Sequence, residues 1–215
     1  MQAILLIRAS PRRQSFSRLI AAEVAARLQE LHPAARIMDR DLAAEPPPHP
    51  DAAFYEAILS RSDGPNPVLD YSERLIVELE QADVVVIGTP MNNFTVPSTL
   101  KAWLDHIVRI RRTFVSTPEG KQGLLRDRPV IVVTASGGYV DQPPGQPDFL
   151  TPYLSAILGC IGLTQLKFLR LEGLARGPEA VERAFAQART AMDQAGWVRS
   201  QATTSAAFRS GGKTG

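Results

Sequence analysis

The chain has 215 residues, of which 44% are hydrophobic, and this is enough for one domain with a well-buried core. Its formal net charge is only +2, from 24 basic and 22 acidic side chains, so the composition gives no support for a nucleic-acid-binding protein. A single cysteine, Cys160, excludes an internal disulfide and a cysteine-rich metal site. No apolar run approaches the roughly 20 residues of a membrane span, and the N-terminus is typical of a strand rather than a signal peptide. We therefore expect a cytoplasmic protein that binds neither nucleic acid nor a membrane.

Five short apolar runs predict the strands of a parallel sheet. In chain order they are residues 3–7, a weaker run at 35–39, then 84–87, 130–133 and 166–171. Most are apolar at nearly every position, as expected of strands that are buried on both faces.

Helical patterns alternate with these runs. Apolar residues at helical spacing are Ile20, Val24, Leu28 and Leu31, then Leu69, Ile76 and Leu79 together with Ser72, and finally Val181, Phe185 and Ala188. The alternation predicts an α/β three-layer sandwich with helices on both faces of the sheet and right-handed crossovers.

Two segments stand outside the alternation. Residues 42–70 are rich in proline and predict an irregular insertion with one short helix at 51–59. Residues 200–215 are small, polar and glycine-rich, and they predict a disordered tail that follows a single domain at 1–199.

The loop after the first strand carries three serines just ahead of the first helix: Ser10, Ser15 and Ser17. Free N–H groups at a helix N-terminus, with added hydroxyl donors, suit a phosphate dianion, and Arg12, Arg13 and Arg18 would raise the local potential. The loop lacks both G-x-G-x-x-G and the P-loop pattern, which disfavours a dinucleotide or nucleoside-triphosphate site. The simpler alternative is that Ser17 only caps the helix.

The loops after the third and fourth strands have the composition of a site for a planar ligand. Met91 and Phe94 offer apolar surface, and Asn92 and Asn93 offer amide groups. The fourth strand ends in a serine and two glycines, Ser136, Gly137 and Gly138, which permit close approach of the backbone. The carboxyl ends of parallel strands are where such folds bind ligands.

Seven segments of the chain together resemble the FMN-dependent NADH-azoreductase and quinone reductase family. They are "AILLIRASPR", "RDLAAEP", "PMNNFTVPSTLKAWLDHIVR", "TFVSTPEGKQGLL", "VTASGG", "TPYLSAILGCIGLT" and "EGLARGPE". The resemblance implies a flavodoxin-like fold with strand order 2-1-3-4-5. It also implies one FMN per subunit, NADH or NADPH as electron donor, and a quinone or azo compound as acceptor in a ping-pong cycle. The family is homodimeric, with its sites at the subunit interface.

The same resemblance assigns roles to residues. Ser10, Ser15, Phe16 and Ser17 would hold the FMN phosphate; Met91, Asn92, Asn93 and Phe94 would line the flavin ring; Ala135, Ser136, Gly137 and Gly138 would contact its pyrimidine side. No side chain is expected to be catalytic, because flavin N5 carries the chemistry. The substrate pocket would include Asn92, Phe114 and Cys160. Asn92 and Cys160 stand where the family usually has a tyrosine and an aromatic residue.

Two other functions compatible with the fold remain open. One is an NAD(P)H-dependent FMN reductase, and the other is a flavodoxin-type electron carrier, although such carriers are typically shorter and strongly acidic. His32, His49 and His106 are scattered in the chain, which argues against a metal site. Arg109, Arg111 and Arg112 could meet dinucleotide phosphates, a partner subunit or solvent.

Overall fold

The computed structural model describes residues 1–60, 64–140, 143 and 145–195. The predicted tail at 200–215, and the end of the predicted domain at 196–199, lie outside these residues. Five parallel strands form the central sheet in the order β2-β1-β3-β6-β7, with bounds β1 Ala3–Arg8, β2 Arg36–Asp41, β3 Val84–Pro90, β6 Val130–Ala135 and β7 Leu166–Leu171. Numbered among themselves, these strands have the predicted order 2-1-3-4-5, so this prediction is confirmed.

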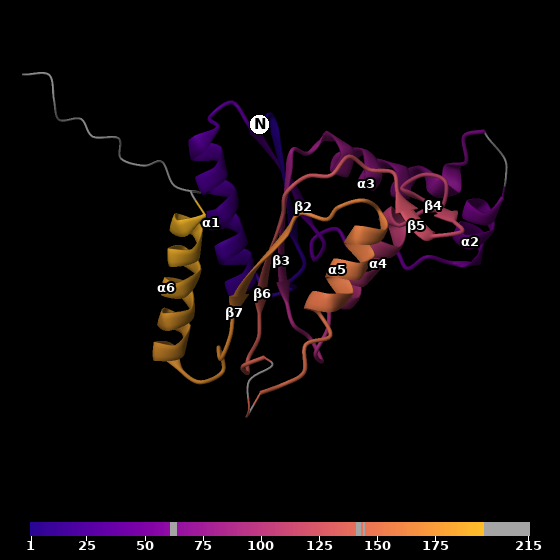
Figure 1. Cartoon of the computed structure of the whole chain (residues 1–215). Coiled ribbons are helices and arrows are strands. Elements are labelled where there is room, and N and C mark those ends of the chain that lie inside the picture. The colour runs from indigo at the N-terminus through magenta and orange to yellow at the C-terminus, as the bar shows by residue number, and fades with distance from the viewer. Residues whose placement is uncertain (61–63, 141–142, 144, 196–215) are drawn as a thin grey trace, which may run out of the picture.

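Helices cover both faces of the sheet (Figure 1). On one face lie α1 (Phe16–Leu31) and α6 (Pro178–Gln194); on the other lie α3 (Asp70–Gln81), α4 (Ser98–Ile107) and α5 (Thr151–Cys160). Each face has its own buried core, one built around Ile20 and Val24 of α1 and the other around Leu75 and Trp103. This is the predicted three-layer arrangement.

The predicted helix patterns are confirmed, with two local differences. Leu69 belongs to a 3-10 turn, η1 (Pro67–Leu69), that precedes α3. In α6 the buried stripe is Ala180, Ala184, Ala188 and Met192, so Val181 and Phe185 lie at its margin. Small side chains let α6 pack closely on the sheet.

The proline-rich insertion packs on α4. It contains the predicted short helix, α2 (Ala52–Leu59), whose first turn is capped by the Asp51 carboxylate, 2.9 Å from the Phe54 nitrogen. His106 of α4 is buried between the rings of Phe54 and Tyr71, and its Nε2 lies 2.9 Å from the Pro48 carbonyl oxygen. Burial lowers the pKa of His106 and favours the neutral ring, in which Nε2 carries the hydrogen that it donates to the Pro48 carbonyl oxygen.

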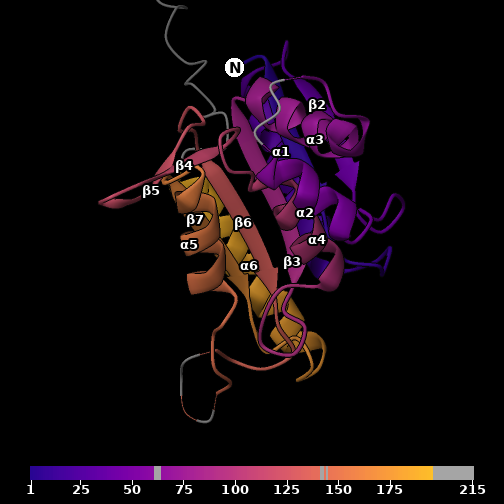
Figure 2. The same ribbon diagram turned by 90° about the vertical axis from the view of Figure 1, so that its right-hand side faces the viewer.

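The sequence did not predict the hairpin formed by β4 (Phe114–Thr117) and β5 (Gly120–Gly123). β5 reads Gly-Lys-Gln-Gly and has no apolar alternation, which explains the omission. The hairpin is fixed to the end of α5, because a Cβ on Gly123 would lie only 2.1 Å from the Gly162 nitrogen. It therefore lies at the amino edge of the sheet, where β6 and β7 begin (Figure 2).

The described ranges contain no helix that is both long and apolar enough to cross a bilayer. The same ranges contain no group of three or more His, Cys, Asp or Glu side chains that could hold a metal ion.

Candidate functional site

A cavity of about 390 Å³ lies at the carboxyl edge of the sheet, where the chain leaves β1, β3, β6 and β7. We call it the carboxyl-edge cavity. It is lined by Ser10, Pro11, Arg12, Ser15, Phe16, Pro90, Met91, Asn92, Ala135, Ser136, Gly137, Leu174 and Ala175. The strand order reverses between β1 and β3, and ligands bind at such points in open parallel sheets. A cavity of this size is in the usual range for small-molecule sites.

The N-terminus of α1 forms the polar end of this cavity. Ser15 is the N-cap residue, but its side chain makes no capping hydrogen bond, and the first turn of α1 contains no acidic residue. Ser17 lies inside the first turn, so the alternative that Ser17 caps the helix is wrong. The hydroxyl oxygens of Ser15 and Ser17 are 3.0 Å apart, and both side chains are buried. A positive helix end with hydroxyls that cap nothing suits an anion.

Close packing of α1 on β3 brings that helix end to the cavity. A Cβ on Gly88 would lie 2.7 Å from the Ser17 carbonyl oxygen and 2.8 Å from the Ala21 Cβ. Only a glycine fits there, because a helix carbonyl and a helix Cβ occupy the space.

Arg18 supports the loop after β1 and does not raise the potential of the cavity as the sequence suggested. Its Nη1 donates to the Ser10 carbonyl oxygen at 2.8 Å and to Asp41 Oδ1 at 2.9 Å, while Nη2 donates to Asp41 Oδ2. This hydrogen bonding lowers the pKa of Asp41 to about 2 and raises the pKa of Arg18. The guanidinium charge is thereby matched by a carboxylate from β2, which sequence spacing could not reveal.

The loop after β3 makes a tight turn beside the cavity. Backbone hydrogen bonds join Asn92 and Thr95 in both directions, and the two residues between them have positive φ, +48° at Asn93 and +70° at Phe94. This is the pattern of a type I′ turn, in which a bulky residue such as phenylalanine is strained. The turn directs Met91 and Asn92 to the cavity, whereas Asn93 and Phe94 do not line it.

The loops after β6 and β7 are joined by backbone hydrogen bonds. Leu174 N donates to Ser136 O and Ala175 N donates to Gly137 O, both at 3.1 Å. Leu174 and Ala175 therefore line the cavity although no role was predicted for them. They belong to "EGLARGPE", a segment that carried the family resemblance, and this was the available signal.

Most predicted cofactor residues meet in one place. Of the twelve, eight line the cavity: Ser10, Ser15, Phe16, Met91, Asn92, Ala135, Ser136 and Gly137. Ser17 lies behind Ser15, and Gly138 lies beside the cavity, where its carbonyl accepts a hydrogen bond from the Ser136 hydroxyl at 2.7 Å.

Phe114 and Cys160, predicted for the substrate pocket, lie at the opposite edge of the sheet. Cys160 ends α5, and Ile161, the next residue, accepts a hydrogen bond from Leu125 N just after the hairpin that Phe114 begins. β6 is six residues long, so about 20 Å of strand separate this edge from the cavity. Neither residue lines the cavity of its own chain.

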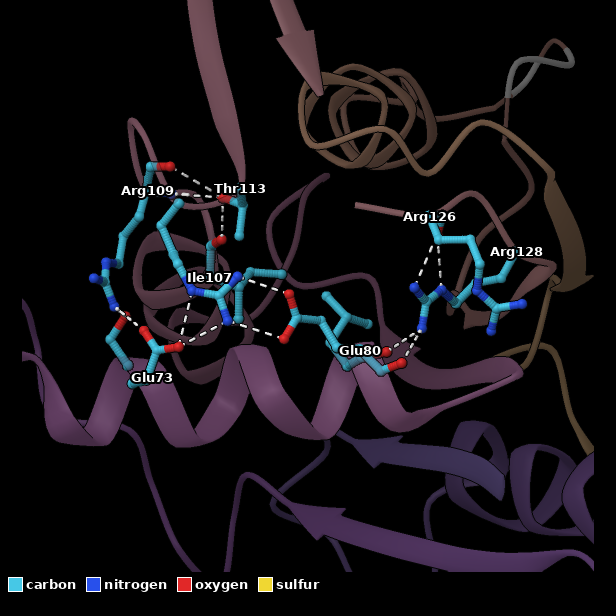
Figure 3. A network of polar contacts seen from close by, with 10 residues as sticks. Glu73, Glu80, Ile107, Arg109, Thr113, Arg126 and Arg128 are labelled. Carbon is cyan, nitrogen blue, oxygen red and sulfur yellow. Dashed lines mark hydrogen bonds and ion pairs between the residues drawn. The ribbon is translucent and has the colours of Figure 1, made fainter. Parts of the chain in front are cut away.

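The arginine cluster at 109–112 also lies away from the cavity. Arg109 and Arg112 both pair with Glu73 of α3, and Arg112 pairs in addition with Glu80. Figure 3 shows Arg109 beside Glu73, with Glu80 farther along the same helix. Arg111 donates to two backbone carbonyls at the end of α2, those of Ile58 and Ser60. Arg109 and Arg112 therefore hold the segment before the hairpin against α3, and Arg111, although exposed, holds it to the end of α2.

Comparisons with known proteins agree with this architecture. A family model described as a flavodoxin-like fold matches residues 2–195. The chain is 49% identical over 191 residues to FMN-dependent NADH:quinone oxidoreductase 2 of Cupriavidus pinatubonensis, covering 86% of this chain and 93% of that protein. It is 45% identical over 194 residues to FMN-dependent NADH:quinone oxidoreductase 4 of Pseudomonas fluorescens, covering 89% and 94%.

Among solved structures, the chain is similar to an FMN-dependent NADH-azoreductase from Bacillus anthracis in complex with FMN. The TM-score is 0.78 at 26% identity, over 91% of this chain and 99% of that chain. A second azoreductase structure from Bacillus anthracis gives a TM-score of 0.81 at 25% identity, over 91% and 99%.

Proposed function

The chain belongs to the flavodoxin-like family, and from this premise we propose that it is an FMN-dependent NADH oxidoreductase that reduces quinones and azo compounds. The observation that carries the proposal is the carboxyl-edge cavity, in which eight predicted flavin residues meet. Its relatives named above are FMN-dependent NADH:quinone oxidoreductases and an azoreductase, which supports the same activity.

The residues of the cavity fit a flavin mononucleotide from one end to the other. The hydroxyls of Ser10, Ser15 and Ser17 at the α1 terminus suit the phosphate. Met91 and Asn92 would lie along the flavin ring, and Gly137 would let the backbone approach the pyrimidine edge. The Met91 side chain is positioned by Gln146, whose amide nitrogen donates to its sulfur at 3.1 Å.

When bound, FMN supplies the ability to accept a hydride from the nicotinamide and to deliver electrons to the acceptor. The protein's part is to hold the flavin phosphate at the α1 terminus and the ring between the loops after β3 and β6. The donor and acceptor would use the same open face in turn, which corresponds to ping-pong kinetics with NADH or NADPH.

A homodimer would complete the site. Phe114 and Cys160 lie about 20 Å from the cavity of their own chain, yet the family places residues at these positions near the substrate. Both observations are reconciled if Phe114 of the partner subunit and Cys160 of the partner subunit enter the site. The ion pairs of Arg109 and Arg112 with α3 would then hold the hairpin in the orientation that such an exchange needs.

Steady-state kinetics of the purified, FMN-loaded protein test the proposal. We expect NADH oxidation to accelerate when benzoquinone is added, with parallel double-reciprocal plots for the two substrates. If benzoquinone has no effect while free FMN is reduced rapidly, the protein is a flavin reductase. If neither is reduced, the electron-carrier alternative is favoured.

A further inference from the structure

A second cavity, of about 420 Å³, lies on the β2 side of the loop that joins β1 to α1. We call it the basic cavity, because Arg8, Arg13 and Arg18 line it together with Asp41. Pro11 lines both this cavity and the carboxyl-edge cavity. The two cavities are therefore neighbours on either side of one short loop.

The charges of the basic cavity are unevenly matched. Arg18 is paired with Asp41, and Arg8 is paired with Asp39, which lies 2.8 Å from its Nε. Arg13 is exposed and has no ion-pair partner among the described residues. The cavity thus offers one uncompensated guanidinium beside two compensated ones.

We propose that the basic cavity binds the pyrophosphate and adenosine half of the nicotinamide dinucleotide, with Arg13 as the residue that contacts the pyrophosphate. This inference rests on the proposed function, in which the nicotinamide lies on the open face of the FMN held in the carboxyl-edge cavity. A dinucleotide consists of two halves joined by an anionic linker, so a dinucleotide whose nicotinamide lies on the flavin can place its other half in an adjacent cavity that carries a cation. A neutral quinone has no group that would use Arg13.

Electrostatics and geometry favour this occupant over a nucleic acid. Arginine recognises phosphate through paired N–H donors, and one unpaired arginine in a concave site suits one short phosphate linker. A polynucleotide would need a row of free cations, whereas the neighbouring arginines Arg8 and Arg18 are already held by carboxylates.

Binding of ADP to the FMN-loaded protein tests the proposal without turnover. Isothermal titration calorimetry is expected to show ADP binding that weakens about fivefold to tenfold in Arg13→Ala, because the lost contact is made by an exposed side chain and is screened by solvent. Arg36→Ala is the matched control, because Arg36 is also exposed but lies at the opposite end of β2. Unchanged ADP affinity in Arg13→Ala would overturn the proposal. Inorganic pyrophosphate binding as tightly as ADP would overturn it too, since the cavity would then recognise charge alone.

Kinetics with a truncated donor give an independent readout. Reduced nicotinamide riboside lacks both phosphates and the adenosine, so Arg13→Ala should raise KM for NADH about fivefold to tenfold and leave KM for the riboside unchanged. An equal effect on both donors would refute the assignment of Arg13 to the adenosine half. Failure of the proposed function has a different signature, because wild-type protein would then not transfer electrons from NADH to benzoquinone, whatever ADP binding shows.

Discussion

The pair formed by Arg18 and Asp41 provides the most quantitative test of how the cofactor loop is held. Arg18 is only 8% exposed and connects Asp41 of β2 to the Ser10 carbonyl at 2.8 Å. Asp41→Asn removes the negative charge with little change in volume, and it leaves a nearly buried guanidinium without its counter-ion. We expect lower stability and weaker FMN binding from this one substitution.

The magnitude follows from the pKa of Asp41, which Arg18 lowers from its ordinary value of 3.8 to about 2. A shift of this size corresponds to about 2.5 kcal/mol of stabilisation of the ionised form. The Asp41 side chain is 20% exposed, and screening by solvent reduces this to about 1 to 1.5 kcal/mol. If that energy holds the Ser10 loop in its binding conformation, its loss raises the FMN Kd about fivefold to tenfold.

Urea unfolding and flavin fluorescence titration measure the two effects. The pKa is lowered in the folded state, so the stability difference between wild type and Asp41→Asn is fully present above about pH 4 and disappears as the pH falls to about 2. Asp39→Asn is the matched control, because Asp39 is 44% exposed and pairs with Arg8 without contacting Ser10. Equal FMN affinity in the two variants would refute the role of Arg18 in positioning the loop.

Three other variants test the cavity. Ser15→Ala combined with Ser17→Ala should lower the affinity for FMN at least tenfold, because donors to the phosphate are lost, and should leave the affinity for riboflavin unchanged. Fluorescence titration measures both affinities, and an equal loss for the two flavins would contradict this prediction. Gly88→Ala should lower the free energy of unfolding by about 1 to 3 kcal/mol, because its Cβ would lie 2.8 Å from that of Ala21; an unchanged urea midpoint would argue against this packing. Asn92→Tyr should have little effect on FMN affinity, but it should change the kcat/KM for benzoquinone relative to the kcat/KM for an azo dye more than threefold. If this ratio stays constant, Asn92 does not contact the acceptor.

Periodicity and composition were sufficient for the architecture. Local properties include the apolar run at residues 84–87 and the spacing of Ile20, Val24 and Leu28. They already indicate which segments are strands buried on both faces and which are helices buried on one face. The serines before α1 and the loops after β3 and β6 could likewise be selected, because parallel strands place their carboxyl ends at one edge.

Local patterns failed where a contact joins distant segments. The hairpin at β4 and β5 has almost no apolar signal, and it is fixed by close packing of Gly123 on the end of α5. Leu174 reaches the cavity only because its backbone nitrogen donates to Ser136, which is 38 positions earlier in the chain.

The sequence by itself determined which segments form strands and helices and which loops line the carboxyl-edge cavity, and the family resemblance implied the order of the strands. The tertiary structure decided which charges are free: it paired Arg18 with Asp41, and among the described residues it gave Arg13, beside the basic cavity, no carboxylate partner. It also placed Phe114 and Cys160 at the far edge of the sheet from Ser10. The physical reason is that periodicity along the chain determines which side chains of an element are buried. The net charge at one place in the structure depends instead on all the segments that pack there, including those distant in sequence.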